Sequence, residues 1–128
     1  MKDIIVTNNR YVYEKYKDDF KIKFDENFTY LDVIKYVRDK IHEGYKLTTH
    51  PLSGSVKPNE TPYKTIMISN DKSALDYDSL AIIEDSIATA KKFMNNKPTP
   101  DWTESVLDDF RVIDLSLIEN VIKKMTHI

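Results

Sequence analysis

Three short apolar stretches predict the strands of a small sheet. Residues 3–7 and 65–69 each contain a continuous apolar run, which is typical of a central strand covered on both faces. Residues 21–25 alternate polar with apolar side chains, and lysines at such positions discourage edge-to-edge pairing. The pattern therefore predicts two central strands and one strand near an edge.

Apolar residues at helical spacing predict the first two helices. A short helix follows Asn8 and Asn9, and either amide can cap it. A second helix is predicted over residues 29–43, where Thr29 and the carboxylate three residues later have the spacing of a capping box. Gly44 stands where a glycine would end that helix.

Three further helices are predicted after the last strand. The longest has its apolar stripe over residues 80–94 and ends at the polar run before Pro98. A short helix begins near Asp101, and a final helix is capped by Asp114 or Ser116.

This order of elements predicts one α/β domain spanning residues 1–128, with three layers and helices on both faces of the sheet. Right-handed crossovers between central strands predict a short, mainly parallel sheet with the spatial order 2-1-3. In such sheets ligands bind beyond the carboxyl ends of the strands, where the strand order reverses. The tip formed by residues 7–9 is predicted to lie at that place. In a parallel sheet, the loop over residues 48–63 would enter the third strand from the opposite end.

Charge and composition exclude several classes of function. The formal net charge is −2 with both signs interspersed, which argues against nucleic-acid binding. The chain has no cysteine and therefore no disulfide, thiolate nucleophile or iron–sulfur ligand. With two glycines it carries no dinucleotide or P-loop fingerprint, and its three histidines are not grouped, so no cofactor or metal is predicted. Because the start resembles no signal peptide and no apolar run could span a membrane, we expect a cytoplasmic protein without membrane contact.

The loop over residues 48–63 is the predicted site. It holds three of the five prolines and one of the two glycines among hydroxyls, an amide and charged groups. Each proline fixes its own backbone and restricts its predecessor, which reduces the entropy lost when the loop becomes ordered. Long ordered loops inside small domains are typically functional.

Two parts of this loop offer chemistry. Histidine is the residue type that titrates near neutral pH, and His50 could serve as a general base for Ser53 or Ser55, although the plainer interpretation is a turn at His50 and Pro51 in which the imidazole caps a loop carbonyl. Ser53, Gly54 and Ser55 followed by Lys57 have the composition of an anion-binding nest, but lack the flanking strand and helix of a phosphate loop.

The other candidates are recognition residues. Asn59 and Glu60 lie between two prolines, and Tyr63 follows the second, so that the prolines would orient these side chains for binding. The alternative is an Ω-loop in which Asn59 and Thr61 satisfy local backbone groups and Tyr63 packs as a lid. Arg38 and His42 are spaced i, i+4 and either extend this cluster or form a solvated helix face. The full set of ligand- or partner-binding candidates is Asn8, Asn9, Arg38, His42, His50, Ser53, Ser55, Lys57, Asn59, Glu60 and Tyr63.

The segments RDKIHEGYKL (residues 38–47) and THPLSGSVKPNETPY (residues 49–63) resemble the GrdX family. Members of this family are small proteins encoded with the glycine, sarcosine and betaine reductase systems of amino-acid-fermenting anaerobic bacteria. The similarity runs from the tip at residues 7–9 to the helix near residue 80. It implies a context of reductive amino-acid fermentation, and the lack of cysteine agrees with an accessory part.

Three hypotheses follow. The leading one is an accessory or regulatory protein, without catalysis, that binds a small anionic ligand or a partner protein such as a reductase component through the 48–63 loop. The alternative is a small hydrolase or transferase with His50 as its general base. A third is a purely structural subunit, whose last two helices would bury an apolar face against a partner or, in a homodimer, a second copy.

Overall fold

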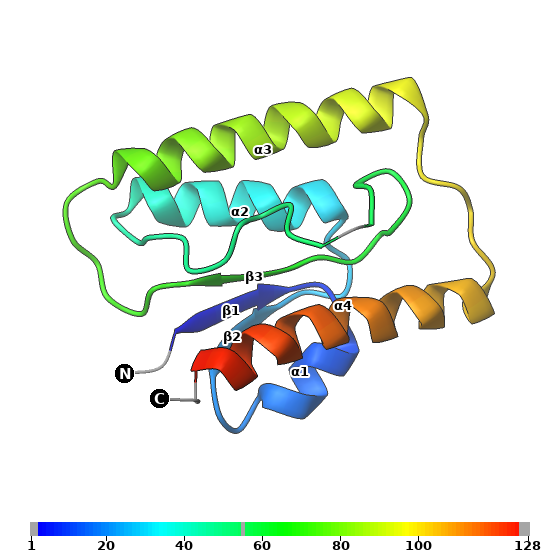
Figure 1. Ribbon diagram of the computed structural model, residues 1–128, viewed down its shortest axis with the longest axis horizontal. Coiled ribbons are helices and arrows are strands. Elements are labelled where there is room, and N and C mark those ends of the chain that lie inside the picture. The colour runs from blue at the N-terminus through cyan, green and yellow to red at the C-terminus, as the bar shows by residue number, and fades with distance from the viewer. Residues whose placement is uncertain (1–2, 55, 126–128) are drawn as a thin grey trace.

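The computed structural model describes residues 3–54 and 56–125 as a mixed sheet covered by helices (Figure 1). The strands run in the order β2-β1-β3, as predicted. The elements in this part of the chain are β1 (Ile4–Thr7), α1 (Arg10–Tyr16), β2 (Lys21–Phe24), α2 (Tyr30–His42), β3 (Thr65–Ile68), α3 (Tyr77–Asn96) and α4 (Glu104–Met125). The predicted α/β class is confirmed.

The two faces of the sheet bury separate apolar clusters. Ile4 and Val6 of β1 pack with α2 and α3, which lie above the sheet in Figure 1. The intervening Ile5 packs with α1 and α4 on the other face. Side chains alternate between faces along a strand, so the continuous apolar run of β1 serves both clusters. This is why a central strand could be predicted here.

The third strand runs opposite to the direction expected from a parallel core. β3 pairs antiparallel with β1, with Thr65 opposite Thr7 and Ile68 opposite Ile4. The cause is the preceding segment, residues 46–49, which first runs along the outer edge of β3. There the Thr48 N–H donates to the Met67 carbonyl (2.9 Å). The 48–63 loop therefore enters β3 at the same end of the sheet as Asn8, and its first residues cover the edge of β3.

The two helices predicted after residue 101 form one continuous helix, α4. It has 22 residues and is longer than α3, which has 20, so the predicted longest helix was also wrong. Asp114 does not cap a helix, because its side chain points into the protein and accepts hydrogen bonds from Asn9 and Thr65. Along the described residues, none of the helices is long and apolar enough to cross a membrane.

The predicted caps of the first helices are confirmed. The Asn9 side chain accepts from the Tyr11 N–H at 3.0 Å and begins α1. Thr29 and Asp32 form the reciprocal capping box of α2. These local signals place the start of each helix at the end of the preceding strand, next to the tip of β1.

Alanine at Gly44 should destabilise the protein more than alanine at Gly54. Both glycines have positive φ (108° and 104°), so either substitution costs about 1–2 kcal/mol in backbone strain. A Cβ at Gly44 would also lie 2.2 Å from the Ser73 carbonyl oxygen, whereas at Gly54 it would meet the flexible end of Leu117 at 2.7 Å. Urea unfolding of the two variants measures the difference, and equal losses would contradict the predicted backbone clash.

Candidate functional site

The amide of Asn8 joins three segments at the tip of β1. Its Nδ2 donates to the carbonyls of Phe28 (2.9 Å) and Pro62 (2.8 Å), and its Oδ1 accepts from the Lys64 N–H at 2.9 Å. The residue is buried. A buried amide with these partners satisfied fixes the end of the 48–63 loop against β1 and the start of α2.

The neighbouring Asn9 connects β1 to α4. Its Nδ2 donates to the Arg111 carbonyl (2.9 Å) and to Oδ2 of Asp114 (3.0 Å). The same Asp114 oxygen accepts from the Thr65 hydroxyl at 2.7 Å, and Thr65 is in turn bonded to the Thr7 hydroxyl at 2.7 Å. A continuous buried network therefore crosses from the strands to the helix.

Burial sets the ionisation of Asp114. Desolvation raises the pKa of its carboxyl group, and the hydrogen bonds from Thr65 and Asn9 together with the positive charge of Lys64 only partly oppose that rise. Burying this carboxylate therefore costs folding free energy, and the neighbours that stabilise its charged form offset part of that cost.

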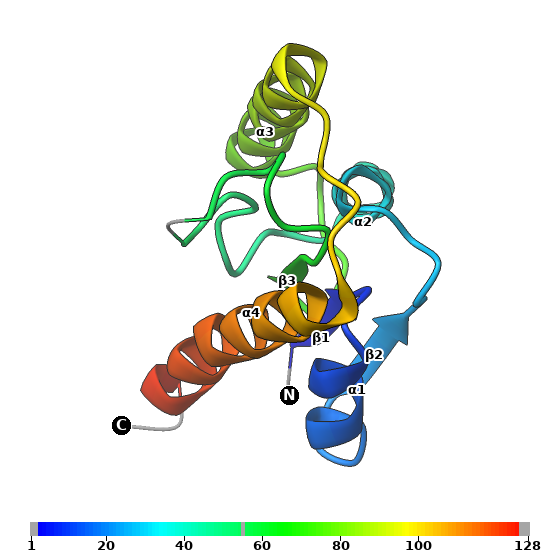
Figure 2. The same cartoon turned by 90° about the vertical axis from the view of Figure 1, so that its right-hand side faces the viewer.

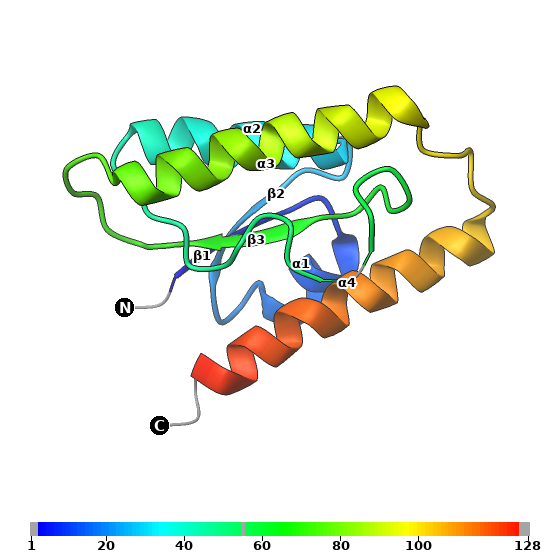
Figure 3. The ribbon, with the colours of Figure 1, turned by 45° about the horizontal axis from the view of Figure 1, so that its top comes forward.

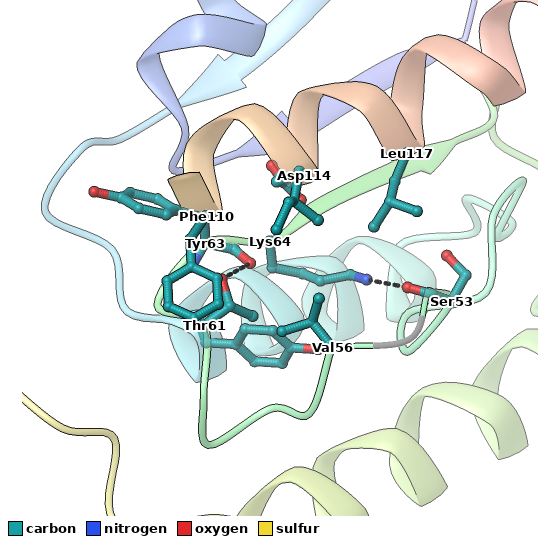
Figure 4. Close-up of a pocket in the computed structure, with 10 residues that line it drawn as sticks. Ser53, Val56, Thr61, Tyr63, Lys64, Phe110, Asp114 and Leu117 are labelled. Atoms are coloured by element: carbon teal, nitrogen blue, oxygen red, sulfur yellow. Dashed lines mark hydrogen bonds between the residues drawn. The ribbon is translucent and has the colours of Figure 1, made fainter. Parts of the chain in front are cut away.

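Lys64 lies between α4 and the loop (Figure 4). Its side chain is buried and extends below Asp114 toward Ser53, whose carbonyl accepts from Nζ at 3.2 Å. Burial lowers the pKa of Lys64, and the nearby Asp114 partly restores it. A cavity of about 20 Å³ beside Lys64 and Asp114 has room for one water molecule.

Arg111 is held between two tyrosine rings. Its guanidinium carbon lies 5.5 Å from the ring centre of Tyr11 and 5.3 Å from that of Tyr63, distances at which cation–π attraction operates. One terminal nitrogen donates to the Tyr63 hydroxyl at 2.9 Å, and the other bonds to the exposed carboxylate of Glu104. Its Nε is buried without a hydrogen-bond partner. The arginine is therefore fixed in place, and within the described structure its ion pair is with the exposed carboxylate of Glu104.

An open hollow of about 620 Å³ is lined in part by Tyr63, whose hydroxyl group accepts from Arg111. Its walls come from the loop, the start of α2, the end of α3 and the linker to α4, and they are mainly apolar. The lining includes Phe28, Tyr30, Pro62, Tyr63, Met94 and Leu107. Asn8 and Glu26 supply polar groups. Arg10 stands next to the hollow, 4.0 Å from Glu26 and 3.9 Å from Glu104. Such a concave, mostly apolar surface with a few polar groups is typical of small-molecule sites.

The loop bordering the hollow is tied to the linker between α3 and α4. The Asn59 Nδ2 donates to the Lys97 carbonyl (3.0 Å), and the Trp102 Nε1 donates to the Glu60 carbonyl (2.7 Å). The Thr61 hydroxyl accepts from the Tyr63 N–H at 3.1 Å. Figures 2 and 3 show the loop lying between α3 and α4. Its path is therefore fixed by contacts with the body of the protein.

Four of the predicted loop residues, His50, Ser53, Lys57 and Glu60, are exposed. His50 lies at the turn that the plainer interpretation described, but its imidazole does not cap a carbonyl there, because its Nδ1 accepts from the Leu52 N–H at 3.1 Å. Thr61 is buried and bonded within the loop, as the Ω-loop interpretation expected, whereas the buried Asn59 donates outside the loop to the Lys97 carbonyl. Ser55 lies outside the described residues.

Arg38 and His42 lie away from the loop. They are in the later turns of α2, whose start is the end next to Asn8. Arg38 bonds to the neighbouring carboxylate of Asp39, and His42 is exposed. The structure therefore brings Asn8, Asn9 and Tyr63 together at one end of the sheet but does not add this pair to them.

Three central residues were not predicted from the sequence: Lys64, Arg111 and Asp114. Lys64 directly precedes the apolar run of β3, and a lysine at that position is typical of an exposed residue just outside a strand. Arg111 and Asp114 share one face of α4 at a spacing of three, and a charged pair on the inward stripe of a helix is the signal that could have identified them. Within the portion of the chain described, no group of three or more histidine or acidic side chains could hold a metal ion.

Comparison with known proteins supports the family suggested by the loop. The family model described as GrdX-like protein matches residues 4–123. The chain belongs to the GrdX-like protein family. The matched range takes in the tip of β1, the loop and Asp114, so the site described above lies within the family domain. No match was found among curated proteins or among solved structures.

Replacing Asp114 with asparagine should change how stability depends on pH. Because the pKa of Asp114 is higher in the folded state, the folded protein binds more protons than the unfolded chain above about pH 4, and the carboxylate lowers the free energy of unfolding as pH rises. Asp114→Asn removes the ionisable group and therefore this decrease in the free energy of unfolding with rising pH. The free energy of unfolding of the variant, relative to the original protein, should therefore increase between pH 4 and pH 7.

Urea unfolding at several pH values measures this difference. Asp109→Asn, which removes an exposed carboxylate from the same helix, is the matched control and should give a much flatter difference. A pH-independent difference for Asp114→Asn would show that burial does not control its ionisation.

Proposed function

We propose that this protein is an accessory or regulatory member of a glycine, sarcosine or betaine reductase system that binds a small anionic ligand or a partner protein through the 48–63 loop. Membership in the GrdX-like family supports the reductase context. The observation that carries the binding role is a loop anchored by buried residues that forms one wall of an open hollow, whose lining residues Glu26 and Tyr63 in turn contact Arg10 and Arg111.

The loop has buried residues that hold it in place and exposed residues that are free to contact a ligand or partner. Asn59, Thr61 and the proline next to Asn8 hold the loop, while Lys57 and Glu60 point to solvent. A loop ordered in advance loses little conformational entropy when a ligand binds. Functional residues on a fixed loop are a common arrangement in binding proteins.

The charges beside the hollow favour an anion. Among the described residues, the ion pairs of Arg10 are long contacts with Glu26 and Glu104, both exposed carboxylates, and such surface pairs contribute at most about 1 kcal/mol. A ligand carboxylate or phosphate can therefore replace them. The aromatic walls would cover the less polar part of the ligand, and rings such as Tyr30 and Phe28 also attract methylated ammonium groups.

The hydrolase or transferase alternative gains no support from the geometry at His50. Its Nδ1 is already occupied by the loop backbone. Among the described residues no hydrogen bond joins His50 to Ser53. Ser53 contributes its carbonyl to Lys64 instead. Within the described part of the loop, His50 therefore lacks the nucleophile–base contact that such catalysis requires.

The structural-subunit alternative has one observation in its favour. Val112 and Ile113 on α4 are 51% and 41% exposed. A subunit that uses this face would have a mass in solution above the 15.0 kDa of one chain. Light scattering after size exclusion measures that mass.

The binding role predicts that a ligand will stabilise the protein. Glycine, sarcosine, betaine and acetyl phosphate are the first compounds to test by thermal shift and calorimetry. A ligand present at one hundred times its Kd adds about 2.7 kcal/mol and raises Tm. Arg10→Ala should weaken its binding about tenfold, since hydrogen bonds to charged groups contribute about 1.5–3 kcal/mol. Lys91→Ala removes one positive charge from an exposed position on α3 and should leave the affinity unchanged.

If none of the compounds binds, the proposal requires a protein partner. Immobilised protein should then capture a purified reductase component, and Lys57→Ala combined with Glu60→Ala should reduce that capture. Failure of both the ligand panel and the capture experiment would overturn the proposed function.

A further inference from the structure

A second hollow lies at the opposite end of the sheet from Asn8. It has a volume of about 210 Å³. Ile4, Ile22 and Ile68 contribute apolar surface, and the rings of Tyr36 and Tyr45 line it from α2 and the segment after it. None of the sequence-predicted site residues lines it. Its chemistry is set by the lysines around it.

Lys21 and Lys23 occupy positions in the sheet where apolar residues would be expected. In the parallel register of β1 and β2, Lys21 pairs with Ile4 and Lys23 with Val6. Paired residues on neighbouring strands share a face of the sheet, and Ile4 and Val6 both belong to the core beneath α2. Both lysines are therefore on the side of the sheet that carries α2, where Lys21 is exposed and Lys23 is half-buried.

Tyrosine rings position the ammonium groups. The Lys23 Nζ lies 5.4 Å from the ring centre of Tyr36, and the Lys40 Nζ lies 5.5 Å from the same ring. Lys40 and Lys72 both lie over Tyr45, at 5.7 and 5.8 Å. Cation–π contact orients a lysine but leaves its full charge available to an anion.

Carboxylates do not balance this group of lysines. Over residues 3–54 and 56–125, the ion pairs of the group involve only Glu43, which lies 3.5 Å from Lys40 and 3.7 Å from Lys72. Lys21 and Lys23 have no carboxylate partner within that part of the chain. The protein as a whole is slightly acidic, with a net charge of −2, so this concentration of positive charge is local.

We infer that this lysine–tyrosine hollow binds a small organic phosphate. Lysine is a compact point charge that suits the several oxygens of a phosphate, and three such groups from separate segments can surround one. The tyrosine rings and isoleucines would contact the organic part. Glu43 competes with the ligand for Lys40 and Lys72. This site is separate from the 48–63 loop and does not depend on the proposed function.

Inward lysines on an edge strand also prevent edge-to-edge association. That role requires the charges of Lys21 and Lys23 but no anion, and it involves neither Lys40 nor Glu43. Substitutions at Lys40 and Glu43 therefore separate the two roles, because they should change anion binding but not protection of the sheet edge.

Calorimetric titration with inorganic pyrophosphate tests the inference. Lys23→Gln and Lys40→Gln should each weaken binding about tenfold or more, because each removes a charge-assisted contact. Glu43→Gln should tighten binding roughly twofold to fivefold by freeing Lys40 and Lys72. A gain in affinity cannot arise from a poorly folded variant. Lys91→Gln on α3 is the matched control and should bind as the original protein does.

Three results would overturn the inference: no pyrophosphate binding, equal binding by Lys40→Gln and the control, or no gain from Glu43→Gln. Titration with succinate at the same ionic strength separates phosphate recognition from simple charge attraction. Succinate affinity equal to that of pyrophosphate would reject a phosphate site. A concentration-dependent rise in mass for Lys21→Gln with Lys23→Gln, together with unchanged pyrophosphate binding, would assign these lysines to edge protection alone.

Discussion

The two adjacent buried asparagines at the end of β1 are the constraint on which the rest of the structure depends. Asn8 ties β1 to the start of α2 and to the end of the long loop, and Asn9 caps α1 while reaching across to α4. A buried amide left without partners would cost about 1–3 kcal/mol, so every segment that supplies a partner is held in register. The same dipeptide therefore makes both a local helix cap and the long-range hydrogen bonds to the loop, α2 and α4. The candidate site follows from this, because the hollow is bordered by the segments that the asparagines bring together.

The reversal of β3 explains how a three-stranded sheet can be stable with so long a loop. Residues 46–49 run along the outer edge of β3 beside residues 67–69 before the chain turns back. This covers an edge that would otherwise expose unpaired backbone groups. The opposite edge, at β2, is protected differently, by lysines on its inward face. The two edges therefore have different chemistry, one covered by backbone and one charged, which places the loop and the lysine–tyrosine hollow in different parts of the molecule.

Features determined by local chemistry could be predicted, and those determined by distant partners could not. The strands and the first two helices follow from apolar runs and from caps such as Thr29 with Asp32. The direction of β3 could not be predicted, because the crossover rule assumes that the chain does not first pair along the sheet edge. Asp114 was assigned to a cap because aspartate favours caps on average, whereas here Asn9 and Thr65 make a buried carboxylate tolerable. The tip at Asn8 and Asn9 was located from topology alone, but its partners at Lys64, Arg111 and Asp114 depend on packing.

The least favourable groups of the described structure lie close to the loop rather than throughout the core. Asp114 and Lys64 are buried charges, and Nε of Arg111 and Oδ1 of Asn59 are buried without partners. Well-packed apolar residues in place of such groups would often make a protein more stable. Elsewhere the chain follows its apolar pattern, and these buried charges and unpartnered polar atoms are concentrated next to one loop. Binding sites are the places where proteins commonly depart from the rule that buried groups are apolar or fully bonded. The apolar clusters on the two faces of the sheet supply the stability that this region does not. The fold can therefore hold a polar, partly unsatisfied junction between α4 and the loop, next to a hollow that is open to solvent.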